Sequence, residues 1–198
     1  MNISMDQLKD LREKTGAGIV DCKKALEESK GDMEEAVKIL RTKGLATAAK
    51  KSGRTAKEGL IGSYIHHNGK IGVMVEIRCE SDFVAKTPQF LELAKDLSMQ
   101  IAAMAPRFVK VEDVPAEVIE QEKVIYREQL KDENKPAPVI EKIVEGKVNK
   151  FFEDSVLMEQ VFVKDNTRKV KDLLGATVAA LAENIQIHRF IRYQVGEE

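Results

Sequence analysis

The sequence contains no tryptophan, only three tyrosines and only two cysteines among its 198 residues. With so few aromatic side chains, the chain is poorly supplied with a platform on which nucleic-acid bases could stack. Cys22 and Cys79 are too few for a disulfide framework and do not have the spacing of metal ligands. They suit a reducing compartment, where we expect each thiol to be a small buried apolar group.

Long apolar runs are also missing, since no stretch approaches the roughly 20 residues that a membrane-spanning helix needs. Residues 1–8 have neither the basic flank and apolar stretch of a signal peptide nor the composition of a transit peptide. The formal net charge of −1 argues against a bulk electrostatic partner such as the DNA backbone. We therefore expect a cytoplasmic protein, with no membrane and no direct nucleic acid among its partners.

The sequence also lacks the residue patterns of an active site. No glycine-rich loop has the spacing of a phosphate-binding loop, and no GxGxxG follows a predicted strand. His66 and His67 belong to a predicted strand end, where neighbouring side chains point to opposite faces, so they are poorly placed to share one metal ion. A hydrolase using His188 would need a nucleophile, and none lies at a recognisable spacing. We expect no enzyme, no catalytic residue, no metal and no cofactor.

The first 44 residues predict three short helices that form a compact bundle with a small core. Ser4 and Asp32 are placed as N-caps, because each is followed three positions later by Gln or Glu. Gly44 is expected to end the third helix. Residues 45–57 are basic without an acidic interruption, and we interpret them as a solvated linker; an RNA-binding patch is the alternative.

The remaining chain predicts few strands and many helices. Asn68-Gly69, between two alternating segments, is typical of a β-hairpin with a type I′ turn, and Thr87-Pro88 begins a long helix. Two charged helices joined at Lys135–Pro138 predict an antiparallel helical hairpin. The strands are expected over residues 60–67, 70–78, 160–164 and 185–195, and the other helices over 88–104 and 167–183. These elements give an α+β fold with a small antiparallel sheet and packed helices.

Two long motifs resemble signatures of the elongation factor Ts family. Residues 11–26 read LREKTGAGIVDCKKAL, and residues 79–86 read CESDFVAK. Residues 144–147 and 191–196 also match the family in character and order. The resemblance covers nearly the whole chain, and the first two motifs are too long to be chance matches.

The resemblance implies a ubiquitin-associated-like three-helix domain with its basic linker over residues 1–55. It also implies an α+β core, the dimerisation domain, over 56–198, with the helical hairpin at 116–150. The implied function in protein biosynthesis is guanine-nucleotide exchange. The chain would bind elongation factor Tu loaded with GDP, disturb its magnesium and phosphate site, and promote replacement of GDP by GTP.

The same resemblance assigns site residues. In the family, a Thr-Asp-Phe-Val segment disturbs the magnesium site of the GTPase, and its Phe wedges beside the nucleotide. These roles carry over to Ser81, Asp82, Phe83 and Val84, with Ser81 in place of the usual Thr. From the residues alone, Phe83 is expected on an exposed loop, because it has no place in a periodic core stripe. A capping role for Ser81 or Asp82 is the alternative.

A second set of residues is implied in docking. Arg12, Ile19 and Val20 fall where the family's N-terminal domain touches the GTPase domain, although Ile19 and Val20 would fit a core equally well. Longer members carry two related core halves and this chain has room for one, which favours a homodimer. The rival function is a small RNA-associated adapter protein that uses the basic residues of segment 50–57.

Overall fold

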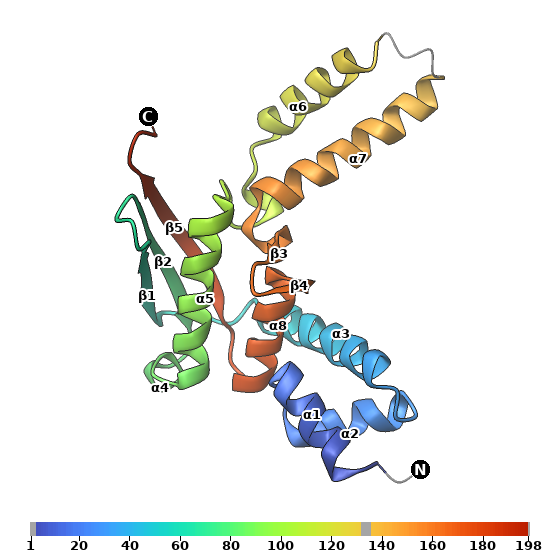
Figure 1. Cartoon of the computed structure of the whole chain (residues 1–198), viewed down its shortest axis with the longest axis vertical. Coiled ribbons are helices and arrows are strands. Elements are labelled where there is room, and N and C mark those ends of the chain that lie inside the picture. Colours follow the sequence, from blue (N-terminus) through green and yellow to red (C-terminus); the bar gives the residue numbers. More distant parts are fainter. Residues whose placement is uncertain (1–2, 132–135, 198) are drawn as a thin grey trace. The chain divides into compact units, whose positions relative to one another are not determined.

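A computed structural model describes residues 3–131 and 136–197. It divides into two compact units, one of residues 1–99 with 171–198 and the other of residues 100–170. Its helices and small antiparallel sheet confirm the expected α+β class (Figure 1). No helix within the described ranges has the length and apolar character needed to cross a membrane.

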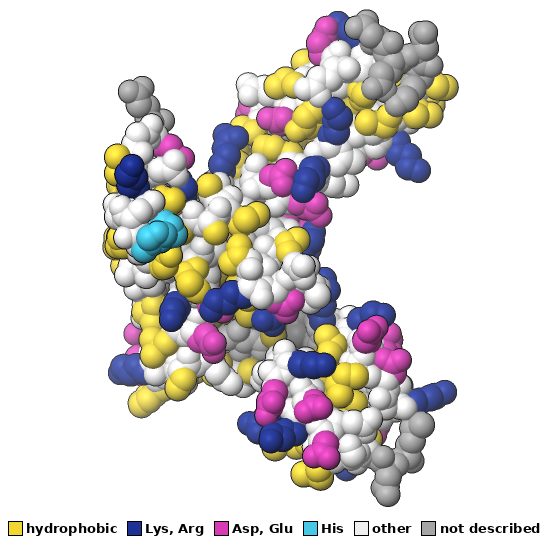
Figure 2. Space-filling view, in the orientation of Figure 1, with side chains coloured by type: hydrophobic (Ala, Val, Ile, Leu, Met, Phe, Trp, Pro, Cys, Tyr) yellow, Lys and Arg dark blue, Asp and Glu magenta, His cyan; other side chains and the backbone are white. Residues whose placement is uncertain are grey.

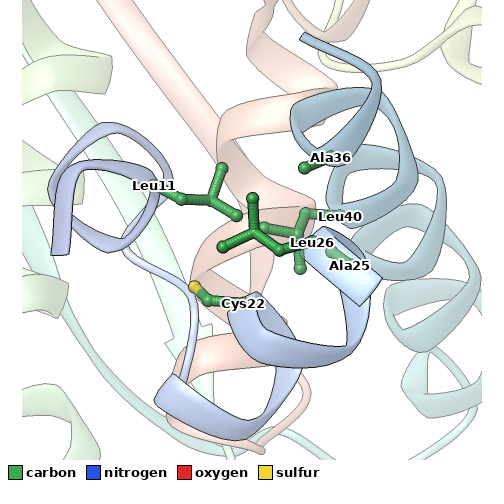
Figure 3. Close-up of a cluster of buried hydrophobic side chains, with 6 residues drawn as sticks. All are labelled: Leu11, Cys22, Ala25, Leu26, Ala36 and Leu40. Atoms are coloured by element: carbon green, nitrogen blue, oxygen red, sulfur yellow. The ribbon is translucent and has the colours of Figure 1, made fainter. Parts of the chain in front are cut away.

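The first unit begins with the predicted three-helix bundle. Its helices are α1 (Met5–Thr15), α2 (Ile19–Glu28) and α3 (Met33–Lys51). The Ser4 hydroxyl accepts the Gln7 N–H at 3.1 Å, and the Asp32 carboxylate accepts the Glu35 N–H at 2.9 Å, which confirms both N-caps. Six buried residues fill the small core (Figure 3): Leu11, Cys22, Ala25, Leu26, Ala36 and Leu40.

The third helix does not end at Gly44, as predicted, but continues to Lys51. A Cβ atom at Gly44 would lie 3.2 Å from the carbonyl carbon and oxygen of Gly175 in α8 (Val170–Leu181). The glycines therefore allow the two helix backbones to approach closely, and Gly44 serves packing rather than termination. Arg41 and Asp172 add an ion pair between the same helices at 2.8 Å.

A three-stranded antiparallel sheet completes the framework of this unit. Its order is β1 (Glu58–Ile65), β2 (Ile71–Cys79) and β5 (Gln186–Gln194). Helix α5 (Pro88–Met104) covers one face, since a Cβ atom at Gly62 would lie 3.0 Å from the carbonyl oxygen of Ala94. The covered face includes the buried side chains of Val73, Val75 and Ile77.

The turn between β1 and β2 differs from the predicted one. Gly69 has a φ of 68° but Asn68 does not have a positive φ, whereas a type I′ turn requires both. The Gly69 N–H instead donates to the His66 carbonyl at 2.8 Å, so the turn begins at His66 and β1 ends at Ile65. The Asn68 side chain accepts the Lys70 N–H at 3.0 Å and supports this longer connection.

Strand β5 contains an irregularity that the alternating sequence did not reveal. The pairing shifts between Glu76 and Ile77, which face Arg189 and Ile187, so His188 is the extra residue of a β-bulge. The bulge places Ile187 in the buried face while Ile191 remains exposed. Simple alternation along the expected strand 185–195 would put Ile187 and Ile191 on one face, and the bulge separates them.

The second unit contains the two charged helices, α6 (Ala116–Gln129) and α7 (Ala137–Ser155). They pack around Leu130, Val144 and Val148, and Arg127 pairs with Glu141 across them at 2.9 Å. The predicted turn at Lys135–Pro138 begins at a residue outside the described ranges. Shorter elements of this unit are η1 (Val111–Asp113), η2 (Leu157–Glu159), β3 (Val161–Phe162) and β4 (Asp165–Lys169).

Strand β4 was not predicted, because its polar run shows no hydrophobic alternation. The sequence instead placed the start of the last helix at Thr167, which lies within β4. Helix α8 begins three residues later, at Val170.

Candidate functional site

The segment Ser81–Val84 forms a fixed turn directly after β2. It was expected to be a loop, but residues Asp82–Ala85 form a single helical turn, α4. Ser81 is its N-cap, because the hydroxyl accepts the Val84 N–H at 3.4 Å. The capping alternative for Ser81 is thus present in the structure, and a helix of one turn is too short to show helical periodicity in a sequence.

Phe83 projects from this turn into solvent with 79% of its surface exposed. Its backbone is held, since the Phe83 carbonyl accepts the Lys86 N–H at 3.2 Å, while the neighbouring Ala85 is buried. An exposed aromatic ring on an ordered backbone is typical of a surface that contacts another molecule. The predicted exposure of Phe83 is confirmed.

Asp82 is the charged member of the segment. Lys86 donates a hydrogen bond to its carboxylate at 2.7 Å and lowers the pKa of Asp82 below its ordinary value. Asp82 is therefore ionised at neutral pH, beside the exposed ring of Phe83. Val84 completes the segment as a half-buried side chain.

Ser81 is bound on both sides by groups that lie outside α4. The Cys79 thiol donates to the Ser81 carbonyl at 3.1 Å, and the Ser81 hydroxyl donates to Glu183 at 2.6 Å. Burial raises the pKa of Cys79, so the thiol remains a protonated donor. Sequence reasoning missed Glu183, because it lies 102 residues from Ser81 and belongs to no local motif.

The second predicted group lies on the N-terminal bundle. Arg12 is on α1, and Ile19 and Val20 begin α2. Ile19 is 53% exposed and Val20 is 64% exposed, so neither is a core residue. Two neighbouring aliphatic side chains on the surface, with a guanidinium group on the preceding helix, suit a contact with a protein partner.

The predicted basic linker is partly engaged within the protein. Lys51 donates to the Ala182 carbonyl at 2.6 Å, and Arg54 pairs with Glu80 at 3.5 Å. On the face shown in Figure 2, basic and acidic side chains are interspersed. These contacts weaken the interpretation of segment 50–57 as an RNA-binding patch, because that role needs free cations gathered on one surface.

The histidine pair does not have the strand geometry assumed for it. His66 and His67 follow the end of β1, and their rings stand edge to face with centroids 4.2 Å apart. The Tyr64 hydroxyl contacts His66 Nδ1 at 3.0 Å. Across residues 3–131 and 136–197, no group of three or more His, Cys, Asp or Glu side chains could hold a metal ion.

A fixed turn with an exposed aromatic ring, and a small bundle with exposed aliphatic side chains, are typical of a protein that acts by binding another protein. Comparison with known sequences identifies its family. The sequence model of the family described as elongation factor TS matches residues 2–197. The chain therefore belongs to the elongation factor Ts family.

Individual relatives match over 90% or more of their length. The chain is 61% identical to elongation factor Ts from Thermotoga maritima over 197 residues, covering 100% of this chain and 98% of the relative. It is 59% identical to elongation factor Ts from Fervidobacterium nodosum over 197 residues, covering 100% of both. For elongation factor Ts from Carboxydothermus hydrogenoformans the identity is 56% over 195 residues, covering 98% of this chain and 90% of the relative. Its function is that of a nucleotide-exchange factor in translation elongation.

Proposed function

We propose that this chain binds elongation factor Tu loaded with GDP and accelerates GDP release by inserting the α4 turn at the magnesium and phosphate site. The observation that carries the proposal is the exposed ring of Phe83 on a backbone fixed by hydrogen bonds. Such a turn can enter a partner with little loss of backbone conformational freedom. The cytoplasm, where translation takes place, is its site of action.

Exchange of this kind requires no bond-making chemistry by the factor. The factor must bind the nucleotide-free GTPase more tightly than the GDP-bound form. By thermodynamic reciprocity, binding of the factor then lowers the affinity of the GTPase for GDP by the same ratio. Release becomes faster because this weakening acts in the ternary complex while GDP is still bound, so that GDP dissociates from that complex and GTP can then enter.

Within the α4 turn, the four residues take separate roles in the proposal. Phe83 is the wedge beside the nucleotide, and Asp82 brings a negative charge toward the magnesium and phosphate site. Ser81 holds the start of the helical turn, and Val84 supports it from its half-buried position. A carboxylate placed near the phosphates weakens their binding, because like charges repel strongly in a site shielded from water.

The bundle surface formed by Arg12, Ile19 and Val20 is proposed as the docking site on the same GTPase. Docking at a second place raises the effective concentration of the α4 turn at the nucleotide site. In this proposal residues 1–55 act as the docking domain, resembling a ubiquitin-associated domain. Residues 56–198 act as the core that carries the wedge.

We also propose that two copies of the chain associate through the uncovered face of the three-stranded sheet. This face carries exposed apolar side chains on all three strands: Ile61, Ile65, Met74, Ile191 and Tyr193. A second copy related by a two-fold axis presents the same face and would cover these side chains without any other partner.

The test of the function is release of a fluorescent GDP from purified elongation factor Tu, with and without this protein. We expect release to accelerate as the concentration of the factor rises and to reach a plateau. An unchanged release rate would overturn the proposal. Filter binding to tRNA, with and without the GTPase, would then test the adapter function.

A further inference from the structure

We propose that Glu183, in the turn between α8 and β5, is a positioning residue that fixes the α4 turn in its active shape. The inference rests on the proposed role of Phe83 as the wedge. Glu183 does not belong to the segment Ser81–Val84, and the proposed wedge does not require it to touch the GTPase. It acts on exchange through the backbone that carries Phe83.

The carboxylate of Glu183 binds the start of the turn through three hydrogen bonds. Its Oε2 atom accepts the N–H of Glu80 at 3.1 Å and the N–H of Ser81 at 3.0 Å. Its Oε1 atom accepts the Ser81 hydroxyl at 2.6 Å. Hydrogen bonds to an ionised acceptor are shorter and stronger than those between neutral groups, so this carboxylate is a firm anchor for the turn.

The third of these bonds also orients the helix cap. Because the Ser81 hydroxyl donates its proton to Glu183, its lone pairs remain available to the Val84 N–H at 3.4 Å. The Ser81 carbonyl in turn accepts the Ala85 N–H at 3.4 Å and the Cys79 thiol at 3.1 Å. The N–H, the hydroxyl and the carbonyl of Ser81 are therefore all hydrogen-bonded, two residues before Phe83. Both hydrogen bonds that Ser81 donates, from its N–H and from its hydroxyl, go to Glu183.

The two turns hold each other through hydrogen bonds in both directions, which makes local opening of either turn less favourable. While Glu183 accepts from the backbone of Glu80, the Glu80 carboxylate accepts the backbone N–H of Asn184 at 2.6 Å. Asn184 is 2% exposed, and its side-chain amide donates to the Arg54 carbonyl at 2.6 Å. The two turns are thus joined in both directions and are also tied to the chain that follows α3.

Fixing this turn matters because Phe83 has few other restraints. A ring with most of its surface in water gains little from packing on its own protein, so its direction depends on the backbone beneath it. Without Glu183, two half-buried N–H groups and a hydroxyl lose their acceptor, and the turn can adopt other conformations. Only the fraction of molecules with the competent turn would then open the GTPase.

The central test is a double-mutant cycle between Glu183→Ala and Phe83→Ala, read by the plateau rate of GDP release from elongation factor Tu. We expect Glu183→Ala to lower that rate by at least about tenfold, the size expected for loss of one charge-assisted hydrogen bond. In the Phe83→Ala background the same change should have almost no effect, because the group that it positions is gone. Equal losses in both backgrounds would overturn the inference.

The cycle also separates this inference from the function on which it rests. Normal exchange by Phe83→Ala would overturn the proposed wedge and, with it, the positioning role. Slow exchange by Phe83→Ala together with normal exchange by Glu183→Ala would overturn the positioning role alone. Hydrogen exchange of the Glu80 and Ser81 amides is a measurement that does not need the GTPase. Both amides should lose protection in Glu183→Ala, and retained protection would contradict the inference.

Two variants distinguish positioning from general stability. Glu183→Gln keeps a carbonyl oxygen for both N–H groups and an amide that can donate to the Ser81 hydroxyl, so it should restore most of the exchange rate. Asp165→Ala is the matched control, because Asp165 likewise accepts a backbone N–H and a hydroxyl, both from Thr167, at 3.1 and 2.6 Å. It should leave exchange unchanged. If Glu183→Ala fails to fold, Glu183→Asp replaces it, and a normal plateau with protected amides in that variant would refute the role.

Discussion

At the scale of single residues, Phe83 and Phe90 form a natural contrast within one stretch of eight residues. Phe83 is 79% exposed, whereas Phe90 in α5 is fully buried. Truncation of an exposed side chain removes little buried area and changes stability by less than about 0.5 kcal/mol. Truncation of a buried Phe costs about 3–5 kcal/mol. The two positions therefore separate loss of function from loss of folding.

We accordingly expect Phe83→Ala to keep its melting temperature and to lose exchange activity. Full burial of a Phe ring in the partner contributes roughly 1.5–3 kcal/mol, so GDP release should slow by about tenfold to a hundredfold. Thermal melting and stimulated GDP release, measured on the same preparation, test both parts. Phe90→Ala is the control and should melt much earlier. A large drop in melting temperature for Phe83→Ala, with normal exchange per folded molecule, would show that the wedge lies elsewhere.

The docking residues predict a different kinetic signature. A variant with both Ile19→Ala and Val20→Ala should need at least about tenfold more protein to reach half-maximal exchange. The two changes remove five carbon atoms, and burial of about two of them in the complex, at about 0.8 kcal/mol each, already accounts for a tenfold change. The plateau rate should remain unchanged, since the α4 turn is intact. Leu26→Ala, in the buried core of the same bundle, should instead lower the melting temperature. A lower plateau with unchanged half-saturation in the first variant would contradict the docking role.

The residues that the sequence could identify are those with a local or family signal. Phe83 was predicted to be exposed because it has no place in a core stripe, and Ser81 was recognised as a candidate cap. Glu183 has no such signal, because the groups that donate hydrogen bonds to its carboxylate lie in a distant turn of the chain. Ser81, for example, is 102 residues away. Contacts of this kind arise only when the fold brings the two turns together.

At the scale of helices and strands, the errors of prediction share a physical cause. A glycine such as Gly44 ends many helices, but it also permits close packing, and only the neighbouring helix decides between these uses. The strand expected at residues 185–195 is present as β5, yet the extra residue His188 shifts the pairing, so side chains before and after it exchange faces of the sheet. Capped helices such as α1 were predicted well, because their signals lie within a few residues.

The contact between α3 and α8 can be tested with glycine substitutions. Gly44→Ala gains about 1 kcal/mol in helix propensity, but its methyl group would lie 3.2 Å from the backbone of Gly175. Overpacking costs about 1–3 kcal/mol, so we expect a net loss of stability of about 1 kcal/mol. Gly146→Ala in α7 is the matched control, because no heavy atom lies within 4 Å of its new Cβ, and it should become more stable. Chemical denaturation measures both, and equal stabilisation would show that close approach of the two backbones is not required.

At the scale of the whole molecule, the uncovered face of the three-stranded sheet exposes apolar side chains to water in a single copy of the chain. Met74 pairs with Ile191, and Gly72 pairs with Tyr193, so the apolar side chains of neighbouring strands lie together on this face. Tyr193 is 67% exposed. A contiguous apolar face of this kind is typical of an interface. One end of the face is polar, where Glu76 binds Arg189 at 2.8 Å and thereby limits how far an apolar contact can extend.

We therefore expect the protein to be a dimer at micromolar concentration, with a mass by light scattering of twice the 22.2 kDa of the chain. Met74→Lys should convert it to a monomer, because a charge at the centre of the face would be buried without a partner on association. Val124→Lys in α6 introduces the same charge at another exposed apolar position and should leave the dimer intact. A monomeric mass for the unmodified protein would contradict the proposed dimer. A dimer that persists in Met74→Lys but dissociates in Val124→Lys would instead move the interface to the helical hairpin.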